Sequence, residues 1–113
     1  MKEIAMIKVY QIHLSDAEYE DANDRGIITD KVKAYYDRYF DHTFKAKQRE
    51  FYTHVANVHT DNMDEAFQLM NLWEDATKVE KLGRCTSMSV GDILEVDGKF
   101  YRCAAFGFDL IEE

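Results

Sequence analysis

The fold is decided by the stretch ILEVDGKFYRCA, which runs from Ile93 to Ala104. Two runs rich in apolar and aromatic residues flank Asp97-Gly98-Lys99. Asp-Gly favours positive φ at both centres of a two-residue turn, the geometry that joins antiparallel strands. The stretch therefore predicts a β-hairpin, followed by a short last strand from Phe106 to Ile111. Gly107 predicts a bulge or a close backbone approach in that strand.

Two further strands are expected upstream of this hairpin. Residues 3–13 carry apolar side chains on both faces of an extended chain, which is typical of a central strand. Residues 51–60 alternate, which places His54 and His59 on opposite faces and keeps them from sharing a metal ion.

Capping signals predict three helices. Ser15 and Glu18 form a capping box, and Gly26 is expected to end the helix that follows, at about Arg25. Thr29 begins a second helix over about 30–41, and Asn62 begins a third that ends at about Asn71 or Leu72.

The segments between these elements are less defined. Residues 41–50 fit either a helical extension or a loop, and 74–86 fit an irregular segment with a helical turn near 76–81. Together the elements predict one α+β domain over residues 1–113, with a small mixed or antiparallel sheet, about three helices and a C-terminal β-hairpin.

The composition narrows the function. The chain has 113 residues and a net charge of −8, which disfavours direct binding of nucleic acid through its phosphates. The acidity fits either solubility, a surface that meets a basic partner, or a surface that imitates the phosphates of DNA.

The sequence contains no apolar run long enough for a membrane span and no signal peptide at its start. We therefore expect a cytosolic protein whose thiols, Cys85 and Cys103, are reduced. The two cysteines and four histidines have no zinc-ligand spacing. No phosphate loop or nucleophile motif is present either, so we expect no cofactor and no enzymatic activity.

Several residues are candidates for partner contact. Tyr35, Tyr36 and Tyr39 lie on the apolar stripe of the second helix, which fits core packing or an interface rich in tyrosine. Trp73 fits a plug at a helix end or an interface anchor. Arg84 and Ser87 belong to residues 84–89, a stretch rich in hydroxyl groups. This stretch fits a turn whose hydroxyls satisfy backbone groups, an anion-binding edge or a partner-binding edge.

The C-terminal half resembles small proteins of bacteriophages and mobile elements that carry a YodL-like module. The resemblance rests on a helix that ends in Asn71, on the segment SMSVGD over 87–92, and on the closing FGF over 106–108. The opening KVYQ (8–11) and YTHVA (52–56) also resemble small proteins of lytic phages. Residues 14–50 depart most from the pattern.

This resemblance implies a phage or mobile-element accessory protein in the host cytoplasm, which acts by binding a host protein. The leading hypothesis is a phage protein that inhibits or redirects a host protein, for example an anti-defence inhibitor. An acidic DNA mimic is one alternative, built on Asp16, Glu18, Glu20, Asp21 and Asp24 together with Asp61, Asp64, Glu65, Glu74 and Asp75. A module that binds a small molecule or nucleotide is another, and self-association through a sheet edge would give a homodimer.

Overall fold

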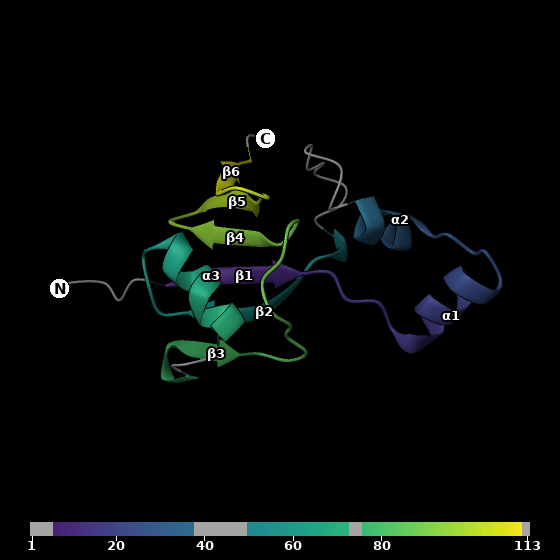
Figure 1. The fold of residues 1–113 in the computed structure, drawn as a ribbon, viewed down its shortest axis with the longest axis horizontal. Coiled ribbons are helices and arrows are strands. Elements are labelled where there is room, and N and C mark those ends of the chain that lie inside the picture. Colours follow the sequence, from purple (N-terminus) through teal and green to yellow (C-terminus); the bar gives the residue numbers. More distant parts are fainter. Residues whose placement is uncertain (1–5, 38–49, 73–75, 112–113) are drawn as a thin grey trace.

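The computed structural model describes residues 6–37, 50–72 and 76–111, which form a six-stranded antiparallel sheet and three α-helices (Figure 1). The strands are β1 (Ile7–Gln11), β2 (Thr53–Val58), β3 (Val79–Lys81), β4 (Ile93–Val96), β5 (Lys99–Cys103) and β6 (Phe108–Leu110). The helices are α1 (Asp16–Asp24), α2 (Asp30–Asp37) and α3 (Met63–Leu72), and a short 3-10 turn, η2 (Ala76–Lys78), precedes β3. The predicted α+β class is confirmed, and all the described strand pairs are antiparallel.

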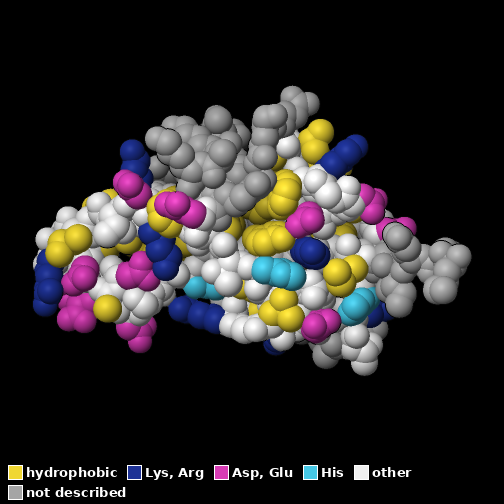
Figure 2. All heavy atoms as spheres, turned by 180° about the vertical axis from the view of Figure 1, so that it is seen from behind, with side chains coloured by type: hydrophobic (Ala, Val, Ile, Leu, Met, Phe, Trp, Pro, Cys, Tyr) yellow, Lys and Arg dark blue, Asp and Glu magenta, His cyan; other side chains and the backbone are white. Residues whose placement is uncertain are grey.

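The strand order is β3-β2-β1-β4-β5-β6, which places β1 in the interior of the sheet as predicted. Helix α3 lies across one face, while α1 and α2 lie beyond the end of β1 (Figure 1). We call the side that α3 covers the helix face and the other side the open face. Figure 2 looks at the molecule from the side of the open face.

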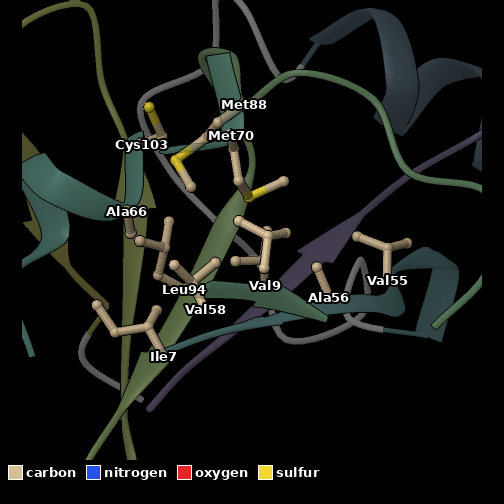
Figure 3. Packing of buried hydrophobic residues seen from close by; sticks show 11 residues of the cluster. Ile7, Val9, Val55, Ala56, Val58, Ala66, Met70, Met88, Leu94 and Cys103 are labelled. Atoms are coloured by element: carbon tan, nitrogen blue, oxygen red, sulfur yellow. The ribbon is translucent and has the colours of Figure 1, made fainter. Parts of the chain in front are cut away.

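The core lies between α3 and the helix face. Ile7 and Val9 of β1 are fully buried there beside Leu94 of β4, and Ala66 and Met70 of α3 cover them. Figure 3 shows Met70, Met88 and Cys103 gathered on one side of the strand residues. Burial of these apolar side chains is the main source of stability for the sheet.

The predicted hairpin is confirmed at its turn. Asp97 and Gly98 have φ of 51° and 77°, and Val96 pairs with Lys99 on either side of them. Positive φ at both centres twists the turn in the sense that matches the twist of the strands.

The expected last strand begins later than the sequence predicts. Strand β6 begins at Phe108, and Phe106 and Gly107 belong to the turn that precedes it. Gly107 has φ of 75°, and a Cβ on it would meet no atom within 4 Å. The glycine therefore serves a left-handed turn conformation rather than a bulge or a close approach.

A β-bulge overturns the expected placement of His54. Val9 pairs with Ala56 and Tyr10 pairs with His54, so Val55 is the extra residue in β2. His54 therefore shares the open face with Asn57, to which its ring nitrogen is hydrogen-bonded at 2.7 Å. A bulge shifts the alternation by one residue, which a period-2 reading of the sequence cannot detect.

The sequence also misses strand β3. Residues 79–81 pair with β2 at the sheet edge, where a helical turn was expected near 76–81; only 76–78 form one. Glu80 and Lys81 are exposed. A short, charged edge strand has no alternation to recognise, and its pairing with distant β2 determines its conformation.

The helix caps are as predicted. The Ser15 hydroxyl accepts from the Glu18 amide at 3.1 Å, and the Glu18 carboxylate accepts from the Ser15 amide at 2.9 Å. Helix α1 buries none of its residues, and Gly26 after it has φ of 66°. Thr29 and Asn62 cap α2 and α3 by accepting from backbone amides.

The segment SMSVGD, residues 87–92, has a structural role. Met88 is buried in the core cluster, and Asp92 is also buried. The Asp92 carboxylate accepts from the Ser89 amide at 3.0 Å, and the Gly91 amide donates to the Cys103 carbonyl at 2.8 Å. These bonds fix the segment 87–92 at the entrance to β4.

Candidate interaction site

The turn between β5 and β6 presents Phe106 to solvent. The amide of Ala104 donates to the carbonyl of Gly107 at 3.0 Å, which closes the turn. Phe106 is 96% exposed, the highest value among the large hydrophobic side chains of the described residues. An isolated exposed apolar residue is ordinary, but aromatic residues, phenylalanine among them, are enriched at protein interfaces.

A shallow hollow lies beside this turn. It has a volume of about 180 Å³ and separates the start of α3 from the β5–β6 connection. Its lining is mixed in polarity, with one exposed carboxylate, and consists of Asp64, Phe67, Cys103, Ala104, Ala105, Gly107 and Phe108. We call Phe106 together with this hollow the Phe106 surface.

The hollow is not equipped for nucleophilic chemistry. Burial, reinforced by the nearby Asp92 carboxylate, raises the pKa of the Cys103 thiol to about 12. The thiol is therefore protonated at neutral pH, and a protonated thiol is a poor nucleophile. What the hollow offers is apolar contact from Phe67, which is 39% exposed, and a negative charge from Asp64.

The two predicted tyrosines that the structure describes come together with a third. The hydroxyls of Tyr35 and Tyr19 are 2.7 Å apart, and the rings of Tyr35 and Tyr36 meet edge to face at 5.3 Å. Tyr36 is exposed and Tyr35 is partly buried. The hydrogen bond to Tyr35 is the main reason that the pKa of Tyr19 is raised to about 12. These rings join α1 to α2, so at least part of this tyrosine stripe stabilises the helical region.

The other predicted contact residues do not form one site. The Arg84 guanidinium donates to the carbonyl of Leu14 at 2.9 Å, and its charge acts on Tyr19, so it lies near the tyrosines. Ser87 is exposed on the segment before Met88. Tyr39 and Trp73 lie outside the described residues.

The open face carries a cluster that the sequence did not reveal. Tyr10 stands beside His54, with ring centres 5.1 Å apart, and beside Phe100 at 6.1 Å. Its hydroxyl donates to the Glu95 carboxylate at 2.7 Å. These side chains come from four strands and are each partly buried, so they form a set of cross-strand contacts.

The acidic residues proposed for DNA mimicry lie in separate places. Those of α1 and those at the start of α3 belong to distant parts of the fold (Figure 1). Lysine and arginine side chains are interspersed with carboxylates on the face in Figure 2. Three of the acids pair with cations, at 3.4 Å for Asp21–Arg25, 3.0 Å for Glu18–Lys31 and 3.6 Å for Glu65–Lys78. Glu74 and Asp75 lie outside the described residues.

Within the described residues, no three His, Cys, Asp or Glu side chains are arranged to hold a metal ion. The same part of the chain contains no helix with the length and hydrophobicity needed to cross a bilayer. No protein-family model, curated protein or solved structure matches this chain.

Proposed function

We propose that this protein is a phage-encoded accessory protein that binds a bacterial host protein through the Phe106 surface and thereby inhibits or redirects it. The observation that carries the proposal is the position of Phe106, which is 96% exposed on a hydrogen-bonded turn. Its placement beside a hollow lined by Phe67 and Phe108 gives a partner several apolar contacts at one point. The phage origin rests on the resemblance of residues 87–92 and 106–108 to YodL-like modules.

The energetics favour an anchor of this kind. Burial of a phenylalanine side chain at an interface contributes about 1.5–3 kcal/mol. The hydrogen-bonded turn fixes the backbone that carries the ring, so less backbone entropy is lost on association. The net charge of −8 adds a long-range attraction toward a basic partner and speeds its encounter.

Affinity capture from a bacterial host lysate tests the proposal. The tagged protein is compared with Phe106→Ala and with the matched control Leu82→Ala, which truncates another exposed apolar residue, one in the segment that follows β3. We expect the native chain and Leu82→Ala to capture one host protein, identified by mass spectrometry, and Phe106→Ala to lose it. Equal capture by all three proteins would contradict the proposal.

A further inference from the structure

The outer edge of β6 has a defined hydrogen-bonding pattern. The amide of Ile111 donates to the carbonyl of Phe100 at 2.8 Å, and that of Ala104 donates to Gly107 at 3.0 Å. Antiparallel pairs alternate between bonded and non-bonded positions, so Asp109 exchanges bonds with β5. The backbone N–H and C=O groups of Phe108 and Leu110 consequently face away from β5.

No strand of the described residues lies beyond β6 in the sheet order. Phe108 and Leu110 place their side chains on the helix face, because they pair with Cys103 and Tyr101. Phe108 lines the hollow, and Leu110 is 48% exposed. The edge therefore combines outward backbone groups with an apolar side.

The opposite edge of the sheet differs. Strand β3 presents the exposed charges of Glu80 and Lys81. Charged side chains, lysine above all, protect an edge strand from pairing with another chain. The β6 edge has one charge, Asp109, which lies on the open face opposite Arg102. Of the two edges, β6 is the one suited to accept a further strand.

We propose that the β6 edge receives an extended, basic segment of the partner protein as an additional antiparallel strand. This inference rests on the proposed function and specifies the chemistry of its partner. Residues of the segment opposite Phe108 and Leu110 exchange backbone hydrogen bonds with them and place their side chains on the helix face, beside the hollow. The residue of the bound segment that lies between these two is placed opposite Asp109. The edge therefore selects apolar residues that alternate with lysine or arginine.

Charge decides between this occupant and a second copy of the chain. Symmetric pairing of two β6 strands about Asp109 would set two aspartates directly opposite each other, and like charges at that position are unfavourable. Each copy also carries a net charge of −8. A basic segment meets the same carboxylate with the opposite sign.

The probe is a capped peptide, Lys-Val-Lys-Leu-Lys-Val, titrated to millimolar concentration against the ¹⁵N-labelled protein. We expect the amide signals of Phe108 and Leu110 to shift. Two methylated peptides give the decisive comparison. Methylation of the backbone nitrogens of valine and leucine should weaken binding by about tenfold or more, because those N–H groups point at β6. Methylation of the backbone nitrogens of the lysines should leave the affinity unchanged, because those N–H groups point away from β6.

Two variants provide a matched test on the protein. Leu110→Pro removes an N–H that points outward from β6. Lys81→Pro removes the equivalent N–H of β3, because the 2.9 Å bond from the Leu82 amide to the Val55 carbonyl makes the neighbouring Lys81 a non-bonded position in the pairing with β2. We expect about a tenfold loss of peptide affinity for Leu110→Pro and none for Lys81→Pro. Equal effects of the two methylated peptides, or no shift at β6, would overturn strand addition.

The two proposals fail in different ways. If Phe106→Ala loses the host protein while Leu110→Pro retains it, strand addition is wrong and the proposed function stands. If Phe106→Ala captures the host protein as the native chain does, the proposed function is wrong whatever the peptides show.

Discussion

Nε2 of Gln11 donates to Oδ2 of Asp92 over 2.9 Å, and this buried bond joins the end of β1 to the segment that leads into β4. Gln11 and Asp92 are 1% and 3% exposed. Oε1 of the Gln11 side chain also accepts from the Thr86 amide at 3.2 Å. One side chain thus satisfies groups on a segment far along the chain, and buried polar groups are costly when left unsatisfied.

Substitution of Gln11 by methionine should therefore destabilise the protein by about 2–4 kcal/mol, because the buried Asp92 carboxylate loses a donor. Gln68→Met, at an exposed position of α3, is the matched control and should change stability by less than about 0.5 kcal/mol. Urea unfolding of both variants measures the difference. A loss below about 0.5 kcal/mol for Gln11→Met would show that the bond adds little.

The helix-face core gives a second prediction. Met70 is fully buried between α3 and the sheet, so Met70→Ala should cost about 2–5 kcal/mol through lost contacts and the cavity left behind. Leu72→Ala removes a side chain of similar size that is 60% exposed and should cost little. Similar unfolding midpoints for the two variants would mean that α3 does not cover the sheet in solution.

The capping box predicts a dependence of stability on pH. The Ser15 amide, and then Lys31, lower the pKa of Glu18 from its usual 4.5. A carboxylate with a lowered pKa stabilises the folded state above its unfolded pKa, and this contribution disappears as pH falls through the folded pKa. Glu18→Gln should therefore be less stable than the native chain near neutral pH, and the gap should narrow below about pH 4.

Thermal unfolding of the Glu18 variant over this pH range gives the comparison, with Glu20→Gln as the control on the same helix. A gap that stays constant with pH would rule out the ionised carboxylate as its cause. Ser15→Ala, which removes the other half of the capping box, should cost about 1 kcal/mol.

The tyrosine pair gives a prediction at high pH. The hydroxyl of Tyr35 is the main cause of the raised pKa of Tyr19, which is about 12. Tyr35→Phe removes that hydroxyl, so the pKa of Tyr19 should move toward the usual 10. Titration of ¹³C-labelled tyrosine by NMR reports each ring separately. An unchanged midpoint for Tyr19 would mean that the two hydroxyls do not interact in solution.

Local signals predicted most of the fold. The turn at Asp97-Gly98 and the caps at Ser15 and Asn62 depend on neighbouring residues, so the sequence reveals them directly. Strand β3 and the bulge at Val55 depend on pairing with residues far along the chain, and a single sequence contains no record of that pairing.

The candidate site was harder to predict. The sequence alone places Phe106 in a strand. In the structure Phe106 lies in the turn before β6, which begins at Phe108 after Gly107 with φ of 75°. The expected contact residues Tyr35 and Arg84 belong instead to contacts that hold the helical region together.

The most direct test of the central claim is photo-crosslinking from position 106. A benzoylphenylalanine replaces Phe106 in one preparation and Leu82 in another, and each is irradiated in a bacterial host lysate. We expect one crosslinked host protein from position 106, which excess native protein competes away, and none from position 82. Absence of a competable crosslink at position 106, or the same products from both positions, would contradict the account.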